Sequence, residues 1–286
     1  MTDLSGKVAL VAGGTRGAGR AIAIELAVTG AKVYVTGRST RAGRSTMDRT
    51  ETIEETAEMI ANSGGEAIPI RVDHSVPEQV ARLVDRIAGE NDERIDILVN
   101  DIWGGDPLAQ WGVPFWQHNL ANGLNLVQNA VNTHIITSWY VAPWMVKRKS
   151  GLIIEVTDGI TSGYRGSLFY DLAKASVNRL ALDQSADLMA YNVAVLAVSP
   201  GFLRSEAMLD HFGVKETNWR DAIAQDPHFA QSETPYFIGR AVAALAADAN
   251  IMAKSGTAVA TWNLGKEYGF TDVDGSRPDW GRYARK

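Results

Sequence analysis

The feature that most constrains the fold lies near the start of the chain, where an apolar segment, a glycine-rich turn and a helical pattern follow one another. Residues 7–12 (Lys-Val-Ala-Leu-Val-Ala) are apolar without alternation, which is typical of a strand buried on both faces of a parallel sheet. Residues 13–19 (Gly-Gly-Thr-Arg-Gly-Ala-Gly) follow, and residues 20–27 show helical periodicity. In this order the backbone N–H groups and the helix dipole face an anion, and glycine lets phosphates come close. The segment therefore predicts a dinucleotide site.

The rest of the chain alternates between strand and helix patterns. This alternation predicts an α/β fold, a Rossmann-type doubly wound parallel sheet of about seven strands with helices on both faces. The predicted strands are residues 7–12, 32–36, 67–72, 95–99, 152–157, 193–199 and 257–261. The predicted helices are residues 17–29, 50–63, 77–90, 118–148, 168–190 and 234–248. Because no repeat or linker divides the sequence, we expect residues 1–286 to form a single domain.

Two connections are longer than such a sheet requires. Residues 39–49 lengthen the connection after the second strand, and residues 101–117 form a glycine-containing loop rich in aromatic residues. Both leave from the carboxyl ends of strands, where open α/β sheets bind ligands. Trp103 and Trp111 are therefore candidates for substrate contact, although tryptophans in such a loop can equally belong to a core or a subunit interface. Residues 262–286 form a C-terminal tail.

Tyr170 and Lys174 lie four residues apart, so on a helix they share one face. An unperturbed tyrosine loses its proton near pH ~10, and a neighbouring positive charge brings that loss closer to neutrality. A phenol tuned in this way can pass a proton to or from an alcohol or carbonyl oxygen. The alternative is a solvated lysine beside a packed ring, because this spacing also occurs by chance.

The glycine turn and this pair together resemble a known family. The spacings Gly13-x-x-x-Gly17-x-Gly19 and Tyr170-x-x-x-Lys174 are similar to those of the short-chain dehydrogenases/reductases, and the resemblance covers nearly the whole chain. It implies a hydride transfer between C4 of a nicotinamide nucleotide and a carbonyl or alcohol carbon of a small, apolar substrate. It also implies that Tyr170 is the general acid or base, and that Lys174 lowers its pKa and holds the nicotinamide ribose.

Further segments match the family in the expected order. Asp73 ends the third strand, where the family places an acid against the adenine, and Asn100 ends the fourth, which implies a contact on the adenosine side. Residues 200–205 (Pro-Gly-Phe-Leu-Arg-Ser) resemble the turn whose later hydroxyl, here Ser205, holds the nicotinamide carboxamide. Residues 268–275 resemble the tail of one subgroup. The implied cofactor-binding set is Gly13, Thr15, Arg16, Gly17, Ala18, Gly19, Arg38, Asp73, Asn100, Tyr170, Lys174, Pro200, Gly201, Leu203 and Ser205.

The end of the second strand predicts which nucleotide binds. NAD-binding proteins of this type place an acid there for the ribose 2′-hydroxyl, but here the position is Gly37. Arg38 follows, and its planar guanidinium suits the 2′-phosphate of NADP(H). Arg16 matches the basic residue that NADP-preferring relatives carry before the second motif glycine. We therefore expect NADP(H), the alternative being two ordinary surface arginines.

The expected catalytic serine is absent. In the family it lies at the end of the fifth strand, about thirteen residues before the tyrosine, and counting back from Tyr170 gives Thr157. Aligning the strand end instead gives Asp158. A threonine hydroxyl can donate to a substrate oxygen as serine does, whereas an ionised aspartate only accepts. The counting favours Thr157, with Asp158 as the alternative; a third possibility is that neither takes part.

Two further family positions are altered. Counting back from Pro143 puts the family's helix-four asparagine at Ala130, and the flanking Asn129 and Asn132 have other directions on a helix. The family has an Asn-Asn-Ala-Gly segment at the end of the fourth strand. In this sequence the corresponding residues 100–104 are Asn-Asp-Ile-Trp-Gly. These changes leave hydride transfer possible. They also support an alternative, an NADP(H)-binding sensor or regulatory protein without turnover, and dehydration or epimerisation through a transient hydride transfer remains a third reading.

Charge and composition exclude several other functions. The net charge of −5 favours neither nucleic acid nor membrane phosphates, and the sequence has neither a signal-peptide pattern nor an apolar run of the ~20 residues that a membrane helix needs. The absence of cysteine excludes disulfides and fits a cytoplasmic location. The five histidines show no metal-ligand spacing, so no metal is expected. The family resemblance implies a homodimer or homotetramer formed through residues 118–148 and 168–190.

Overall fold

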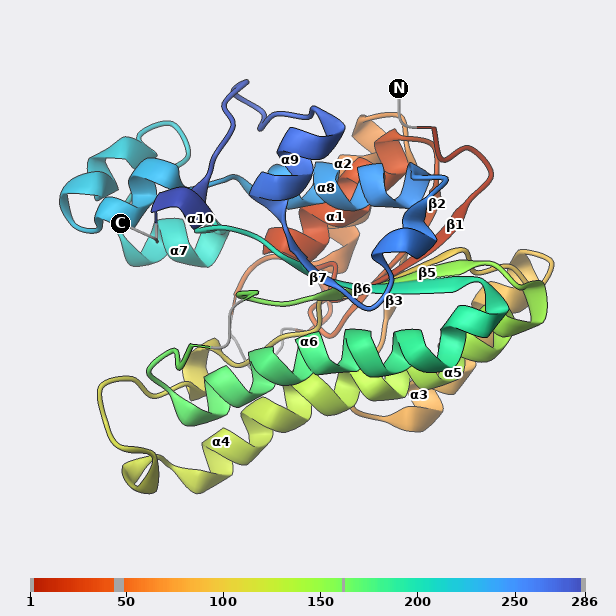
Figure 1. The fold of residues 1–286 in the computed structure, drawn as a ribbon, viewed down its shortest axis with the longest axis horizontal. Helices are drawn as coiled ribbons and strands as arrows, with labels where there is room; N and C mark the ends of the chain where they lie inside the picture. The colour runs from red at the N-terminus through yellow and green to blue at the C-terminus, as the bar shows by residue number, and fades with distance from the viewer. Residues whose placement is uncertain (1–2, 44–48, 161–162, 284–286) are drawn as a thin grey trace.

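The computed structural model describes residues 3–43, 49–160 and 163–283, so residues 44–48 of the expected insertion at 39–49 lie outside the described residues. The strands are β1 (Val8–Ala12), β2 (Lys32–Gly37), β3 (Glu66–Arg71), β4 (Ile97–Asn100), β5 (Gly151–Val156), β6 (Val193–Ser199) and β7 (Ala258–Ala260). They form one parallel sheet in the order β3-β2-β1-β4-β5-β6-β7, which confirms the predicted doubly wound parallel sheet (Figure 1). The strand order reverses between β1 and β4, and folds of this kind bind ligands at that point.

Each segment predicted to be helical contains a helix in the structure. The helices are α1 (Gly17–Val28), α2 (Ile53–Asn62), α3 (Pro77–Glu90), α4 (Leu120–Val127), α5 (Thr133–Arg148), α6 (Leu168–Leu188), α7 (Glu206–His211), α8 (Pro235–Ala247), α9 (Thr261–Tyr268) and α10 (Trp280–Tyr283). The short helices α7, α9 and α10 lie outside the predicted segments. In the described part of the chain, no helix is long and apolar enough to cross a membrane.

Helices cover both faces of the sheet, above and below it in Figure 1. Successive side chains of a strand point to opposite faces. Ala9 and Val11 pack into one core with α1 and α8, whereas Val8 and Leu10 pack into a second core with α3, α5 and α6. Both faces of β1 are therefore buried, which explains its uninterrupted apolar run.

The helix predicted over residues 118–148 is interrupted. A π-helical segment, Gln128–Asn132, lies between α4 and α5. A π-helical turn holds more residues than an α-helical turn, so side chains on its two sides no longer follow the 3.6-residue spacing. As a result Asn129, in this segment, lines the cavity described below.

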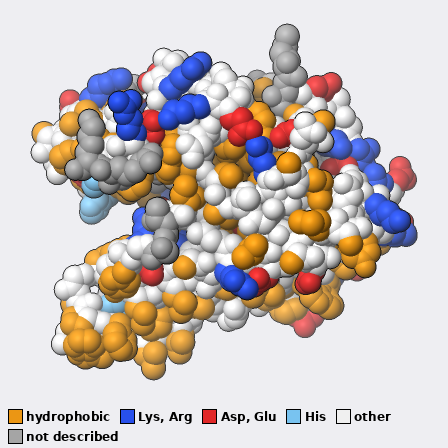
Figure 2. Space-filling view, in the orientation of Figure 1, with side chains coloured by type: hydrophobic (Ala, Val, Ile, Leu, Met, Phe, Trp, Pro, Cys, Tyr) orange, Lys and Arg blue, Asp and Glu red, His pale blue; other side chains and the backbone are white. Residues whose placement is uncertain are grey.

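The predicted loop insertion at residues 101–117 leads into α4, and the two extend beyond the sheet as an arm (Figure 1). Hydrophobic side chains gather at the end of this arm, at the lower left of Figure 2. Phe115, Trp116, Leu120 and Leu124 are each more than half exposed there. These residues form a surface and do not line the cavity described below.

Candidate active site

A cavity of about 1000 Å³ lies at the carboxyl ends of the strands. Figure 2 shows the hollow at the left, between the lobe that carries α7 and α10 and the arm that carries α4. Predicted site residues that line it are Gly13, Thr15, Arg16, Gly17, Ala18, Arg38, Asp73, Trp103, Thr157, Asp158, Tyr170, Lys174, Pro200, Gly201, Leu203 and Ser205. Gly19, Asn100 and Trp111 do not line it. Sixteen residues chosen from sequence thus surround one space.

The glycine turn requires glycine for steric reasons. A Cβ on Gly13 would lie 2.3 Å from the carbonyl oxygen of Asp101, and one on Gly19 would lie 2.4 Å from the carbonyl oxygen of Gly13. Gly17 has a φ of +54°, in the left-handed region that side chains disfavour. Gly19 therefore packs against the backbone of Gly13, while Gly13 and Gly17 line the cavity. This geometry fits the close approach of dinucleotide phosphates.

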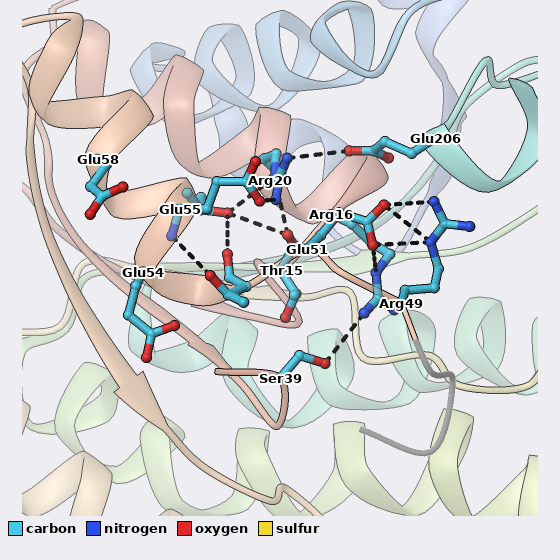
Figure 3. A network of polar contacts seen from close by, with 12 residues as sticks. Thr15, Arg16, Arg20, Ser39, Arg49, Glu51, Glu54, Glu55, Glu58 and Glu206 are labelled. Carbon is cyan, nitrogen blue, oxygen red and sulfur yellow. Dashed lines mark hydrogen bonds and ion pairs between the residues drawn. The ribbon is translucent and has the colours of Figure 1, made fainter. Parts of the chain in front are cut away.

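A carboxylate already lies at this turn. Glu206, at the start of α7, accepts a hydrogen bond from the backbone N–H of Gly17 at 2.9 Å, and its second oxygen lies 3.6 Å from the guanidinium of Arg20 (Figure 3). The preceding Ser205 caps α7 by accepting from the N–H of Met208 at 3.3 Å. The N-terminus of α1 thus holds an anion in this structure, as expected for a helix end of this kind.

Asn100 lies beneath the cavity. Its side chain is fully buried and donates to Ser138 Oγ at 2.9 Å and to Glu155 Oε1 at 3.1 Å. Glu155 in turn contacts His134 Nδ1 at 2.7 Å, and His134 Nε2 lies 3.1 Å from the carbonyl oxygen of Ile102. The side chain of Asn100 therefore supports the loop after β4 from below, and its contact with the adenosine side stays a prediction.

Tyr170 faces Asp158 in the cavity. The phenol donates a short hydrogen bond to Asp158 Oδ2, and the guanidinium of Arg165 binds the same oxygen at 2.8 Å and the backbone oxygen of Asp158 at 2.6 Å. Burial, and then the carboxylate of Asp158, raise the pKa of Tyr170 above its ordinary value. The prediction that Lys174 lowers this pKa is wrong for this arrangement, because a carboxylate lies closer to the phenol than the ammonium does.

Lys174 lies on the same face of α6 as Tyr170, as predicted, but it contacts a different ring. Its ammonium lies 3.9 Å from the ring centroid of Trp103 and 5.8 Å from that of Tyr170. Burial lowers the pKa of Lys174, while the carboxylates of Asp158 and Asp101 oppose that shift. The indole therefore holds the ammonium in a cation–π contact at the cavity wall.

Thr157 and Asp158 both line the cavity, but their side chains make different hydrogen bonds. The hydroxyl of Thr157 donates to the backbone oxygen of Lys174 at 3.0 Å, and the residue is 2% exposed. Its donor is thus already used within the protein. Asp158 is the residue that contacts Tyr170, so the geometry favours Asp158 over the sequence count that favoured Thr157.

Asp101 and Asn129 were not predicted as site residues, yet both line the cavity. Burial raises the pKa of Asp101 to about 7, while Lys174 and the N–H of Gly19 oppose that rise. Asn129 lies in the π-helical segment, whereas Ala130, the position given by counting, packs into a small core. The altered residues 100–104 were the available signal for Asp101. For Asn129 there was none, because counting assumes a regular helix.

The two predicted arginines lie at the cavity, each beside an acid. Arg38 is 3.9 Å from the carboxylate of Asp73, and Arg16 is 3.3 Å from the carboxylate of Glu51. Arg16 also donates to Ser39 Oγ at 3.3 Å, and Ser39 lines the cavity (Figure 3). The expected 2′-phosphate corner therefore contains cationic and hydroxyl donors together with carboxylates.

Aromatic rings form the wall beside Tyr170. The ring centroids of Trp103 and Trp111 lie 5.5 Å and 4.9 Å from that of Tyr170, although Trp111 does not line the cavity. Elsewhere the cavity is lined by Trp262 and Trp280 of the C-terminal tail, for which the sequence predicts no role. Within the described residues, no cluster of acidic and histidine side chains could hold a metal ion.

Comparison with known proteins places this site in a family. The family model for short chain dehydrogenases matches residues 7–212, from β1 to the end of α7. The mouse dehydrogenase/reductase SDR family member 1 is 31% identical over 96% of this chain and 86% of its own length. The human protein of that name is 30% identical over 95% and 85%. The subgroup resemblance at the C-terminal tail is to proteins of this name.

Solved structures agree in fold. A 7α-hydroxysteroid dehydrogenase complexed with NADH and 7-oxo glycochenodeoxycholic acid has a TM-score of 0.73 at 22% identity, covering 96% of each chain. An actinorhodin polyketide ketoreductase with NADPH has a TM-score of 0.73 at 22% identity, covering 89% of this chain and 95% of its own. With the family match, the glycine turn and the tyrosine–lysine pair in one cavity, the chain is a member of the short-chain dehydrogenase family.

Proposed function

We propose that this chain is an NADP(H)-dependent oxidoreductase that transfers a hydride between nicotinamide and a carbonyl or alcohol carbon of a small, apolar substrate. The observation that carries the proposal is that one cavity contains the glycine turn, Tyr170 and Lys174. A nucleotide bound at the turn and a substrate beside the phenol would therefore share one cavity. The named reactions of relatives support carbonyl and alcohol chemistry, such as that of the Synechocystis sp. 3-oxoacyl-[acyl-carrier-protein] reductase, which is 34% identical over 72% of this chain.

Each part of the nucleotide has a place in this proposal. The turn from Gly13 to Gly19 binds the pyrophosphate, and Asp73 lies at the adenine side. Arg16 and Arg38 bind the 2′-phosphate. The other end of the nucleotide meets Ser205, at the carboxamide, and Lys174, at the nicotinamide ribose. When bound, the nicotinamide supplies or accepts the hydride.

The proton follows a path through Tyr170 and Asp158. In alcohol oxidation, Tyr170 would accept the substrate's hydroxyl proton while its own proton passes to Asp158, and the carbon that bears this hydroxyl would give up its hydride to the bound nicotinamide. The short hydrogen bond from the phenol to Asp158 supports this path, and Arg165, which donates to the same carboxylate oxygen, holds Asp158 in position. A raised pKa of Tyr170 is then no obstacle, because no free phenolate needs to form. Reduction follows the reverse path from protonated Asp158.

Removing Arg38 tests the choice of nucleotide. We expect NADP(H) to bind at least ~10-fold more tightly than NAD(H), the scale of one charge-assisted contact, and Arg38→Ala to remove most of that difference. Calorimetric titration of both nucleotides measures it. Arg41→Ala, which removes an exposed arginine paired with Glu58, is the matched control and should keep the preference. Equal affinity of the parent protein for both nucleotides contradicts the assignment.

We also propose that the chain acts in the cytoplasm. We further propose that it forms a homodimer or homotetramer through α5 and α6. Trp139 and Leu172, one on each helix, are 69% and 50% exposed. Burying such side chains against a second copy would remove apolar surface from water. Trp139→Lys should therefore shift the protein to monomer in light-scattering chromatography. A parent protein that is monomeric at micromolar concentration contradicts the proposal.

The sensor alternative also has an observation in its favour. The phenol of Tyr170 is bound to a carboxylate and its pKa is raised, an arrangement that also fits a protein which binds NADP(H) without turnover. The two functions differ in one measurable respect, the oxidation or reduction of the nicotinamide in the presence of an alcohol or carbonyl compound.

A further inference from the structure

Glu51 lies at the centre of a charged cluster beside the cavity (Figure 3). Its carboxylate accepts from Arg49 Nε at 3.1 Å and 3.0 Å and from the terminal nitrogen of Arg49 at 2.6 Å. On another side, Nε of Arg16 lies 3.3 Å from the same carboxylate. Both arginines thus share one anion, and Glu51 is only 8% exposed.

Because Arg16 lines the cavity, its ion pair with Glu51 affects how it can bind a ligand there. Arg16 and Ser39 line the cavity at the corner assigned to the 2′-phosphate, and Arg16 donates to Ser39. Burial alone would raise the pKa of Glu51, but Arg49 and Arg16 hold it below its ordinary value, so the carboxylate is ionised at neutral pH. An ionised carboxylate on Arg16 attracts the same guanidinium that a 2′-phosphate needs.

We propose that Glu51 is a specificity-determining residue that competes with the 2′-phosphate for Arg16, and that Arg49 limits this competition by engaging Glu51 from the other side. The inference rests on the proposed use of NADP(H). It adds a pair of residues, in the connection between β2 and α2, that act on Arg16. Glu51 and Arg49 are positioning residues here, since neither lines the cavity.

Removing the charge of Glu51 tests the competition directly. Glu51→Gln keeps the shape and a hydrogen-bond acceptor but removes the charge. It should tighten binding of NADP⁺ and of adenosine 2′,5′-bisphosphate by about 3- to 10-fold, the range of a partly screened charged contact, and leave NAD⁺ and AMP unchanged. Calorimetric titration with these four probes measures affinity independently of any catalytic step. A destabilised variant would lose affinity for all four, which separates a folding defect from the proposed effect.

Arg49 supplies the second arm of the test. Arg49→Gln should weaken adenosine 2′,5′-bisphosphate binding by about 3-fold or more, because Glu51 then pairs with Arg16 alone. In the Glu51→Gln background the same change should have no effect, because Arg49 acts through Glu51. If Arg49→Gln weakens binding equally in both backgrounds, Arg49 contacts the phosphate itself and the proposed mechanism is wrong.

A matched ion pair between this connection and α2 serves as the control. Glu58 and Arg41 form an ion pair with side chains 56% and 60% exposed, so Glu58→Gln should leave all four affinities unchanged. In Glu51→Gln, unchanged affinity for the two 2′-phosphate probes, or weaker affinity for these two alone, overturns the inference; if all four affinities fall, the Arg49→Gln comparison decides. The proposed function fails by a different result, the absence of nicotinamide turnover, so the two can be judged separately.

Discussion

Tyr170→Phe is expected to lower turnover by ~100-fold or more, the usual size of a general acid–base contribution, while leaving NADP(H) affinity nearly unchanged. Phenylalanine keeps the ring that lies against Trp103 and Trp111, but it removes the hydroxyl that donates to Asp158. The proton path from the substrate then has no first acceptor. Steady-state kinetics on an accepted substrate, together with calorimetric titration of the nucleotide, measure the two quantities.

Tyr191→Phe is the matched control, because Tyr191 lies after α6 and is 42% exposed. It should change neither turnover nor nucleotide affinity. A Tyr170→Phe variant that turns over like the parent protein would remove Tyr170 from the mechanism. Equal loss of nucleotide affinity and turnover would instead mean that the phenol supports the site only structurally.

Asp158→Asn is expected to lower turnover by a similar ~100-fold, because the amide cannot accept the proton that Tyr170 passes on. Asparagine has nearly the shape of aspartate and can still meet Arg165 through its carbonyl oxygen. Since Tyr170 and Asp158 act on one proton, the double variant Tyr170→Phe/Asp158→Asn should be little slower than either single variant. Kinetics of the three variants on one substrate measure this non-additivity.

Thr157→Val discriminates between the two candidates for the missing serine. We expect a small effect, because the Thr157 hydroxyl already donates to the backbone oxygen of Lys174. If Thr157 instead donates to the substrate oxygen, the change should cost about 2–4 kcal/mol of transition-state stabilisation, as for a lost oxyanion donor. A large effect of Thr157→Val combined with no effect of Asp158→Asn would reverse the assignment.

Features set by local sequence were predicted well. Apolar runs such as residues 193–199 match β6 at both ends, because a strand buried on both faces needs an uninterrupted apolar segment. The glycine turn could be predicted because its glycines are required by the fold. A Cβ added at Gly13 or Gly19 would lie 2.3 Å or 2.4 Å from a backbone oxygen. The short helices α7, α9 and α10 were missed, since a few residues give too little periodicity to recognise.

The parts of the site that depend on tertiary contacts could not be predicted. The contact between Asp158 and Arg165 joins two loop residues with no periodic relation. Asn129 reaches the cavity because of a π-helical segment, which counting along a regular helix does not reveal. Glu51 is buried between Arg16 and Arg49, a contact that joins the glycine turn to the connection before α2 and that no local pattern reveals.

The most direct test of the central claim is a spectrophotometric assay of the parent protein with NADP⁺ and a panel of small apolar alcohols, and with NADPH and the matching ketones and aldehydes. We expect the absorbance of reduced nicotinamide to change with at least one compound, and Tyr170→Phe to slow this change ~100-fold at equal nucleotide affinity. Tight NADP(H) binding by calorimetry with no turnover of any compound would contradict an oxidoreductase and support the sensor instead.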